Sequence, residues 1–397
     1  MTPSPAPPPR TRYLEAAVRD DALADHKMAF LSGPRQVGKT TLARTLLSSP
    51  HNEFSWDDQR FRIRWVKDPV GAVADRGEGP ILLDEIHKDR RWKSRLKGLW
   101  DLRGRELPIV VTGSARLDLF RRSGDSLLGR YLPYRLHPFT LGERPDPPTP
   151  DRILQQTTPV FPFEDLLALG GFPEPLLAGN QARARRWSRL RTERLVYEDL
   201  RDLRHVHDLQ ALRVLADLLP DRVGSPLSVN SLREDVGVAY GTVREWVQIL
   251  EALYHVLLVR PWAGRLSRTL RAEPKLYLYD FLPVEGPGPR RENLAALHLL
   301  KACHAWTDLA HGDFALHYLR TREKHEVDFL VVRDRRPWML VECKSNDHEP
   351  APALRKFSGL LRTRFNFQLV DTRGYDRAYP EHHLRVLDYE RFLAGLP

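Results

Sequence analysis

Short apolar runs alternate with amphipathic stretches through the first 150 residues of the chain, and this pattern predicts an α/β fold. Apolar runs bounded by turn-forming residues are typical of buried strands, and apolar positions three or four apart are typical of helices. The expected strands are Lys27–Ser32, Asn52–Trp56, Pro80–Leu83, Pro108–Thr112 and Leu132–Leu136. Helical stretches between them, after a first helix at Arg12–His26, predict a parallel sheet whose ligand lies at the carboxyl ends of its strands.

The pattern changes after the Pro-rich joint Arg144–Pro150. A helical pattern runs over Phe163–Leu219, interrupted by the turn Gly170–Pro175. Ser228–Leu250 has the pattern of a helix–turn–helix, and the strand expected at Tyr254–Pro261 could form a wing beside it. The expected divisions are a disordered Pro-rich leader at 1–11, an α/β domain at 12–150, a helical region at 151–220, a winged helix–turn–helix at 221–265 and a second α/β domain at 266–397.

A glycine-containing segment joins the first expected strand to its helix and matches the pattern GxxxxGK[ST]. In this context the pattern is typical of a phosphate-binding loop, because glycines let backbone N–H groups turn toward phosphate oxygens. We expect Lys39 to reach the β- and γ-phosphates and the Thr40 hydroxyl to ligate Mg²⁺. The expected ATP-binding residues are Gly33, Pro34, Arg35, Gln36, Val37, Gly38, Lys39, Thr40 and Thr41.

Two carboxylates, Asp84 and Glu85, follow the apolar run Ile81–Leu83. Alone, such a pair is common, and it could be the solvated end of a strand before the next helix. In an α/β pattern and 45 positions after Lys39, it is typical of the Walker B motif. Asp84 is then expected in the Mg²⁺ shell, and Glu85 is expected to orient and deprotonate the attacking water. The two motifs together predict that the chain binds ATP and Mg²⁺.

The formal net charge is +10, which favours a polyanion such as DNA as a partner. A GC-rich genome that places arginine on ordinary surfaces explains the same excess. The Arg-rich stretch Arg183–His205 could be a DNA-facing helix. We expect instead a solvated helix whose arginines pair with Glu193, Glu198 and Asp199.

Cysteine usage and hydropathy favour a cytoplasmic protein. The two cysteines, Cys303 and Cys343, form neither a disulfide framework nor a CxxC metal pair, which suits a reducing compartment. No apolar run approaches the roughly 18 residues that a membrane span needs. We therefore expect no membrane partner.

Near the C-terminus, Glu326–Val332 and Trp338–Lys344 have the pattern of a β-hairpin. The two-residue period of a strand places Glu342 and Lys344 on one face, with Asp328 on the neighbouring strand. Two carboxylates and an ammonium then converge. A pair of salt-bridged strands without activity would have the same pattern.

This D…ExK arrangement is typical of metal-dependent nucleases, in which carboxylates hold Mg²⁺ and a lysine supports the nucleophile. Glu292, on the helix expected at Arg291–Cys303, could complete the acidic cluster. The expected catalytic residues of this site are Asp328, Glu342 and Lys344, and its expected metal ligands are Glu292, Asp328 and Glu342.

As an ordered set, these motifs resemble the bacterial and archaeal AAA-type P-loop ATPases that carry a C-terminal domain of uncharacterised function with a restriction-endonuclease-like, PD-(D/E)xK core. The resemblance covers nearly the whole chain after about residue 12. The matching pieces are Gly33–Leu42, Leu82–Ile86, Thr112–Ser114, Ser126–Arg130, Pro138–Glu143, Gly170–Glu174, Thr242–Trp246, Tyr277–Asp280, Glu326–Phe329 and Val341–Lys344.

The resemblance implies an AAA-type core, a winged helix and a nuclease-like C-terminal domain. It implies that Thr112 or Ser114 is the sensor of the γ-phosphate. It also implies that Arg130 is an arginine finger, acting in a neighbouring subunit if the protein forms a ring or dimer. A surface arginine that anchors a carboxylate is the alternative for Arg130.

The leading hypothesis is an ATP-hydrolysing AAA-type protein that couples nucleotide state to DNA handling. Whether the C-terminal domain also has Mg²⁺-dependent nuclease activity is left open. One alternative is an ATP-dependent signalling switch whose C-terminal domain is an inactive nuclease-like docking module. A second alternative is a nuclease whose cleavage is gated by ATP binding.

Overall fold

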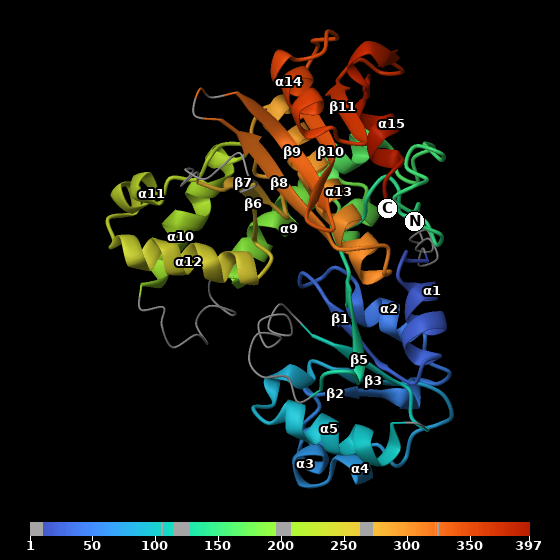
Figure 1. The fold of residues 1–397 in the computed structure, drawn as a ribbon. Coiled ribbons are helices and arrows are strands. Elements are labelled where there is room, and N and C mark those ends of the chain that lie inside the picture. The colour runs from blue at the N-terminus through green and yellow to red at the C-terminus, as the bar shows by residue number, and fades with distance from the viewer. Residues whose placement is uncertain are drawn as a thin grey trace, which may run out of the picture. The chain divides into compact units, whose positions relative to one another are not determined.

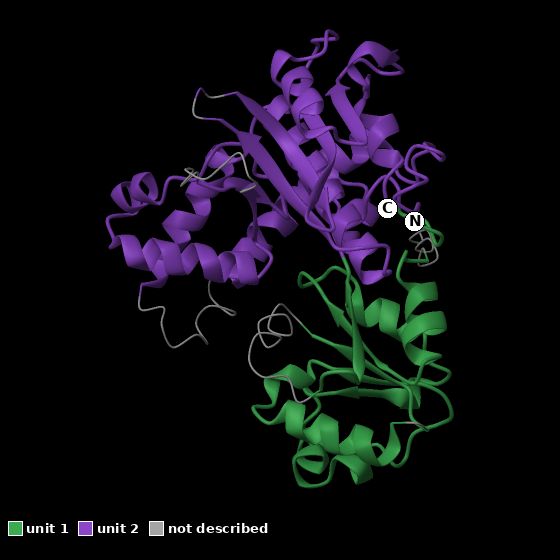
Figure 2. Cartoon of the chain, viewed as in Figure 1, with its two compact units in different colours: residues 1–136, 143–147 green, residues 137–142, 148–397 purple. Residues whose placement is uncertain are grey.

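The computed structural model describes residues 11–104, 106–113, 127–195, 208–262, 273–321, 323 and 325–397. The chain divides into two compact units (Figure 2). Unit 1 comprises residues 1–136 and 143–147, and unit 2 comprises residues 137–142 and 148–397. The predicted leader lies almost entirely outside the described residues. The divisions expected at residues 220 and 265 fall inside unit 2 and stay predictions.

The described residues of unit 1 form a five-stranded parallel sheet in the order β2-β3-β4-β1-β5 (Figure 1). Its strands are β1 (Met28–Ser32), β2 (Glu53–Ser55), β3 (Ile81–Asp84), β4 (Ile109–Thr112) and β5 (Tyr131–Arg135). The parallel sheet predicted from the apolar runs is confirmed. Its register places Asp84 of β3 beside Ser55 of β2 and beside Thr112 of β4. The polar residues that end these strands therefore meet at the carboxyl ends of the strands.

Helices pack on the sheet of unit 1. They are α1 (Glu15–Ala17), continued by a π-helix (Val18–Leu23), α2 (Lys39–Thr45), α3 (Gln59–Lys67), α4 (Pro69–Ala72) and α5 (Trp92–Arg103), with 3₁₀ turns at Pro50–Asn52 and Ile86–Lys88. Phe30 of β1 belongs to one buried cluster with Trp65 of α3 and Trp92 of α5. Because side chains alternate across a strand, Ala29 and Leu31 are left for the other face, and both are fully buried.

The described residues of unit 2 form an eight-stranded mixed sheet in the order β12-β13-β11-β10-β9-β8-β6-β7. Its strands are β6 (Val256–Pro261), β7 (Lys275–Leu278), β8 (Phe314–Arg320), β9 (Glu326–Arg333), β10 (Arg336–Cys343), β11 (Phe365–Val370), β12 (Asp376–Tyr379) and β13 (Leu384–Asp388). β9 and β10 form the predicted hairpin. Its turn residues Asp334 and Arg335 both have positive φ, as a tight two-residue turn requires.

The helices of unit 2 are α7 (Phe163–Leu169), α8 (Pro173–Ala178), α9 (Gln181–Arg194), α10 (Leu209–Leu218), α11 (Val229–Val236), α12 (Tyr240–Ala252), α13 (Pro287–Asp308), α14 (Pro352–Leu361) and α15 (Tyr389–Ala394), with 3₁₀ turns at Leu219–Arg222 and Pro380–His382. Buried polar contacts hold α13 in the centre of this unit. The Asn293 amide bonds both the N–H and the carbonyl of Leu278, each at 2.8 Å. In the part of the chain that is described, no helix combines the length and the apolar character needed to cross a membrane.

The predicted helix–turn–helix corresponds to α11 and α12, which are joined by a left-handed Gly237 with φ of +75°. β6 and β7 then form an antiparallel pair, as the strands of a wing do. The last residues of β6 also pair with β8, so this pair continues into the eight-stranded sheet. The winged-helix interpretation stays a prediction.

Candidate functional site

The loop between β1 and α2 turns through left-handed backbone at its glycines. Gly33 and Gly38 have φ of +142° and +96°, and Gln36 between them has φ of +62°. Glycine adopts these angles without the steric cost that a side chain brings. An ideal Cβ on Gly33 would lie 2.2 Å from the Leu136 carbonyl oxygen, so the loop also needs a glycine for close packing.

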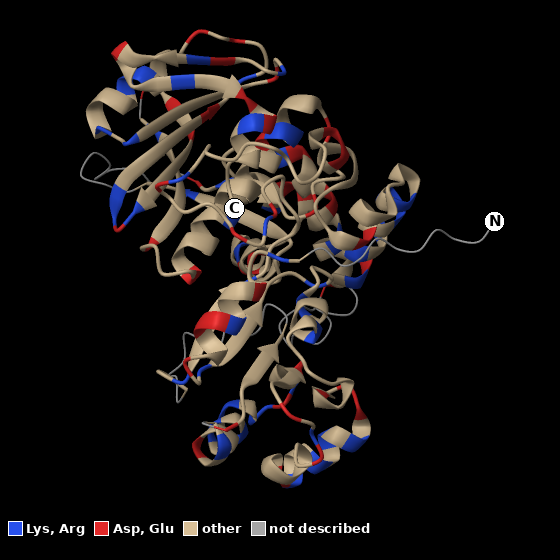
Figure 3. Ribbon diagram, turned by 90° about the vertical axis from the view of Figure 1, so that its right-hand side faces the viewer, with Lys and Arg blue, Asp and Glu red and all other residues tan. Residues whose placement is uncertain are grey.

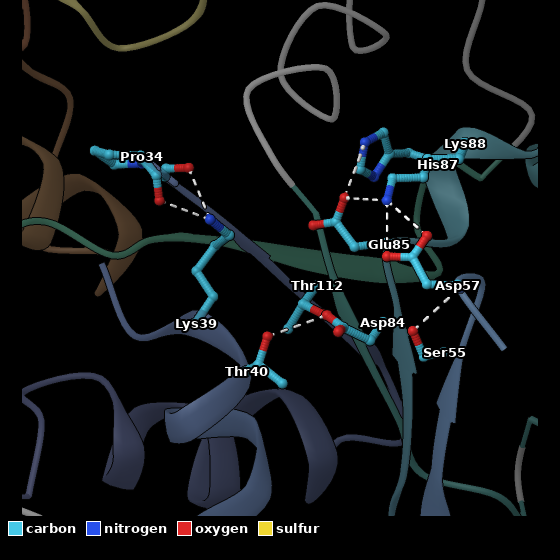
Figure 4. Close-up of polar contacts among 11 residues, drawn as sticks. Pro34, Lys39, Thr40, Ser55, Asp57, Asp84, Glu85, His87, Lys88 and Thr112 are labelled. Carbon is cyan, nitrogen blue, oxygen red and sulfur yellow. Dashed lines mark hydrogen bonds and ion pairs between the residues drawn. The ribbon is translucent and has the colours of Figure 1, made fainter. Parts of the chain in front are cut away.

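Lys39 lies buried at the start of α2, with 7% of its surface exposed. Its Nζ donates to the carbonyl oxygens of Gly33 at 3.0 Å and Pro34 at 2.7 Å (Figure 4). Hydrogen bonds from an ammonium to phosphate oxygens are stronger than those to neutral carbonyls. A triphosphate in the loop would therefore compete well for this ammonium.

Asp84 lies at the carboxyl end of β3 between two threonine hydroxyls (Figure 4). Thr40 donates to its Oδ1 at 3.2 Å, and Thr112 on β4 donates to the same oxygen. Burial raises the pKa of Asp84 above its ordinary value, although both hydroxyls act to lower it. A hydroxyl and a carboxylate in contact are oxygen ligands of the kind that Mg²⁺ prefers. The residues present therefore fit a Mg²⁺ ion at this sheet edge.

Glu85 follows Asp84 with left-handed backbone, at φ of +55°, which is uncommon for a residue with a side chain. Its Oε2 lies 3.6 Å from Lys88 Nζ and 3.7 Å from His87 Nε2. Lys88 also pairs with Asp57 at 2.8 Å (Figure 4). The backbone turn thus lets two consecutive carboxylates meet different partners, Asp84 the threonines and Glu85 the basic residues of the following 3₁₀ turn.

Arg12, which lies outside the sequence motifs, links the loop to Glu143, the last residue of the matching piece Pro138–Glu143. The Arg12 guanidinium donates to the Val37 carbonyl at 3.0 Å and to Glu143 at 2.7 Å. The Arg12 and Glu143 side chains are 6% and 0% exposed. Sequence reasoning missed this pair because its members lie 131 positions apart.

The remaining predicted nucleotide residues have mixed outcomes. Arg35 and Thr41 are exposed. Ser114 lies outside the described residues, so of the two sensor candidates only Thr112 is placed. Arg130 pairs with Asp101 at 3.0 Å and lies over the Trp100 ring. This is the arrangement expected from the alternative, a surface arginine that anchors a carboxylate, and the finger role stays a prediction.

In unit 2, the predicted D…ExK residues lie together on β9 and β10. The Asp328 backbone N–H donates to Glu342 Oε2 at 3.2 Å, and the Cys343 N–H donates to Asp328 Oδ2 at 2.9 Å. Lys344 pairs with Glu342 at 2.7 Å. The strand period predicted this convergence of two carboxylates and an ammonium from the sequence.

Glu292 also joins this group, from the first turns of α13. It accepts a hydrogen bond from the Tyr277 hydroxyl at 2.8 Å. Burial, followed by the charge of Asp328, raises the pKa of Glu292 to about 7. The same two causes raise the pKa of Glu342 to about 7. The site is therefore crowded with buried negative charge.

A lysine that sequence reasoning missed lies among these carboxylates. Lys275, on β7, is 1% exposed, and its Nζ lies 2.6 Å from Glu326, 2.8 Å from Asp328 and 3.5 Å from Glu292. Its only signal in the sequence is a lysine at the start of an apolar strand. Among the residues that the structure describes, no group of three or more His, Cys, Asp or Glu is arranged to hold a metal ion. The carboxylates as placed do not fit the predicted divalent ion, because an ammonium lies between them.

The two helices considered for DNA contact, α9 and α12, each bury one face and expose another. Tyr240 and Arg244 lie on the surface at the start of α12, with Thr242 partly buried between them. α9 exposes a row of arginines: Arg183, Arg185, Arg186, Arg189 and Arg194. Within the described part of the chain, none of this row is in ion-pair distance of a carboxylate. The predicted pairing with Glu193 is therefore wrong, and Glu198 and Asp199 lie outside the described residues.

Three family models match successive parts of the chain. Residues 25–144 match a family described as an AAA domain, residues 161–281 match a domain of unknown function (DUF8612), and residues 288–391 match a second domain of unknown function (DUF4143). Similar curated proteins are the uncharacterised proteins Rv2008c of Mycobacterium tuberculosis and Mb2031c of Mycobacterium bovis. Each is 26% identical over 328 residues, which cover 80% of this chain and 70% of the relative. The uncharacterised protein MJ1637 of Methanocaldococcus jannaschii is 25% identical over 299 residues, covering 65% and 61%.

Two solved structures show weak overall similarity. The Aeropyrum pernix ORC1 protein in complex with DNA has a TM-score of 0.34 and 14% identity, covering 74% of this chain and 95% of that chain. A variant of Thermotoga maritima RuvB has a TM-score of 0.30 and 18% identity, covering 64% and 87%. Residues 25–144 are therefore similar to the AAA domain family, and the loop, Lys39 and Asp84 on a parallel sheet agree with that match.

Proposed function

We propose that this protein hydrolyses ATP in unit 1 and uses the nucleotide state to control how unit 2 handles DNA. The observation that carries the proposal of ATP hydrolysis is the contact of Thr40 with Asp84. The buried Lys39 precedes Thr40 in the chain, and Glu85 follows Asp84. Lys39 and Thr40 come from α2, Asp84 is the last residue of β3 and Glu85 follows it, and each has the chemistry that phosphoryl transfer to water needs.

We assign a task to each of these residues and to Thr112. Lys39 leaves its two backbone carbonyls and binds phosphate oxygens. Thr40 and Asp84 would hold Mg²⁺, which would neutralise negative charge on the phosphates. Thr112 keeps the Asp84 carboxylate oriented through its hydroxyl. Glu85 orients the attacking water and accepts its proton.

The proposal that unit 2 handles DNA rests on two exposed helix faces, one of them rich in arginine. The exposed arginine row of α9 has no carboxylate partner in the described residues, so its charge is available to backbone phosphates. Tyr240 and Arg244 are exposed at the N-terminal end of α12, the end that contacts bases in helix–turn–helix proteins. Elsewhere, basic and acidic residues are interspersed along the ribbon (Figure 3).

ATP hydrolysis is tested with Lys39→Ala. We expect the wild-type protein to hydrolyse ATP in Mg²⁺ and the variant to lose at least about 100-fold of the rate, because a phosphate-stabilising cation is removed. Rates should be measured without polymer and with duplex, single-stranded and branched DNA. Lys27→Ala, which removes a lysine of unit 1 that bonds the Gly129 carbonyl, is the matched control. If the wild type hydrolyses ATP no faster than Lys39→Ala under all of these conditions, the proposed ATPase activity is refuted.

DNA contact by α12 is tested with Arg244→Ala against Arg355→Ala, which removes an exposed arginine of α14 in the same unit. We expect Arg244→Ala to weaken DNA binding several-fold and to lower the slope of log affinity against log salt by about one, since one positive charge fewer at the DNA releases about one counterion fewer. Arg355→Ala should change neither. Equal effects of the two substitutions, or no DNA binding by the wild type, would contradict the proposal that unit 2 handles DNA. The proposal of ATP hydrolysis would be unaffected.

The second candidate is the signalling switch, in which unit 2 is an inactive docking module for protein. One observation favours it: the nuclease-like carboxylates already contact protein cations, Lys275 and Lys344. This candidate predicts normal ATP binding, slow hydrolysis and no response of the rate to any DNA.

A further inference from the structure

The carboxylate cluster of unit 2 has a cation of its own at its centre. Glu326 and Asp328 lie two positions apart on β9, so they share one face of the sheet. Lys275 approaches both from β7, and Glu292 approaches Lys275 from α13. Three carboxylates from two elements thus surround a single ammonium.

The ammonium is buried and paired with three carboxylates. Lys275 is 1% exposed, and its Nζ lies 2.6 Å from Glu326, 2.8 Å from Asp328 and 3.5 Å from Glu292. The free energy of bringing carboxylates into the interior is offset by this fixed positive charge.

The remaining oxygens of the motif are also engaged. Asp328 uses its second oxygen for the Cys343 N–H, and Glu342 uses its two oxygens for Lys344 and for the Asp328 N–H. A divalent ion that bound between Asp328 and Glu292 would have to displace Nζ from a position with almost no exposure to solvent.

We propose that Lys275 is the permanent cation of this cluster and takes the place of a divalent ion, so that unit 2 holds its nuclease-like carboxylates as a metal-free ion network. The network joins β7 to β9 and α13. Lys275 belongs to the stretch that matches one family model, and its three carboxylates belong to the stretch that matches the next. The lysine therefore connects two separately matched segments. Every residue involved lies in unit 2, so the proposal is independent of ATP hydrolysis in unit 1.

The test is to remove the lysine and offer a metal in its place. Lys275→Ala leaves the position of Nζ vacant among three carboxylates, which are ligands suited to Mn²⁺. Full-length protein should be compared without nucleotide and in an Asp84→Asn background, so that unit 1 contributes no metal site. We expect the melting temperature of Lys275→Ala to fall by roughly 6–20 °C, since removing one partner of a buried ion pair leaves uncompensated charge.

Mn²⁺ should then restore several degrees to the variant, because a ligand bound only by the folded state stabilises it. We call the protein with Asp84→Asn alone the parent. Mn²⁺ binding measured by electron paramagnetic resonance should be at least tenfold tighter in Lys275→Ala than in the parent. The matched control is Lys301→Ala, which removes a fully buried lysine of α13 that donates to the Thr140 hydroxyl at 2.8 Å. It should lose stability without any rescue by Mn²⁺. Equal Mn²⁺ responses in the two variants would overturn the proposal.

A second comparison holds even if Lys275→Ala fails to fold. In the parent, Mn²⁺ binding should be the same with and without Asp328→Asn, because Lys275 and not a metal neutralises this carboxylate. A Mn²⁺ site in the parent that disappears with Asp328→Asn would show that a metal displaces the lysine, and the proposal would be wrong.

Discussion

Glu85→Gln is expected to lower the rate of ATP hydrolysis by about 10²–10⁴-fold while ATP binding persists. The amide has nearly the same shape as the carboxylate but accepts no proton from water. The Glu85 carboxylate lies against His87 and Lys88, whereas Lys39 bonds backbone carbonyls and Thr40 bonds Asp84, so we expect the residues that hold the nucleotide to stay in place. Single-turnover hydrolysis and equilibrium binding of labelled ATP measure the two effects separately.

The matched control for this substitution is Glu78→Gln, which changes an exposed glutamate before the opposite end of β3. It should leave both quantities unchanged. Glu85→Gln also distinguishes the two candidate functions. Trapping the ATP-bound state should make the protein retain DNA more tightly if unit 2 handles DNA, and should leave DNA retention unchanged if unit 2 docks protein. Loss of ATP binding in Glu85→Gln would contradict the role assigned to Glu85.

Gly33→Ala is expected to destabilise unit 1 by more than about 3 kcal/mol and to abolish ATP binding. Its φ of +142° is unfavourable for alanine, and the added Cβ would lie 2.2 Å from the Leu136 carbonyl oxygen. That oxygen is backbone next to β5, so it cannot rotate away. Urea unfolding followed by the fluorescence of the buried tryptophans Trp65 and Trp92 measures the change.

Gly98→Ala provides the matched control. Gly98 lies inside α5 with no atom within 4 Å of an added Cβ. The substitution should stabilise unit 1 by about 0.5–1 kcal/mol, because alanine favours the helix. If Gly33→Ala unfolds at the same urea concentration as the wild type, the close approach of the loop to Leu136 does not exist in solution.

The placement of the candidate nucleotide site could be predicted from the sequence because its signals are local. A run of apolar residues, a glycine pattern and two carboxylates each lie within one short segment. The parallel sheet brings the ends of such segments together, as the Asp84–Thr112 register illustrates. The hairpin that carries Asp328 and Glu342 was predictable for the same reason, since the strand period of two places their side chains.

Arg130 shows where a local pattern is insufficient. Its spacing within the motif is compatible with a finger and with a surface ion pair. The outcome depends on Asp101, 29 positions away on α5. The arginines of α9 are a second case, because the pairing expected along the helix with Glu193 is absent in the described structure.

The sequence by itself determined the α/β class of unit 1, its approximate strand positions and the order in which Lys39, Thr40, Asp84 and Glu85 follow them. These features depend on residues close in the chain, whose period and order can be read directly. Only the tertiary structure decided what lies against them. Lys275 meets Asp328 from 53 positions away, and Arg12 meets Glu143 from 131 positions away. Such contacts are selected by the packing of whole elements, and their energy depends on burial, which no local pattern of residues encodes.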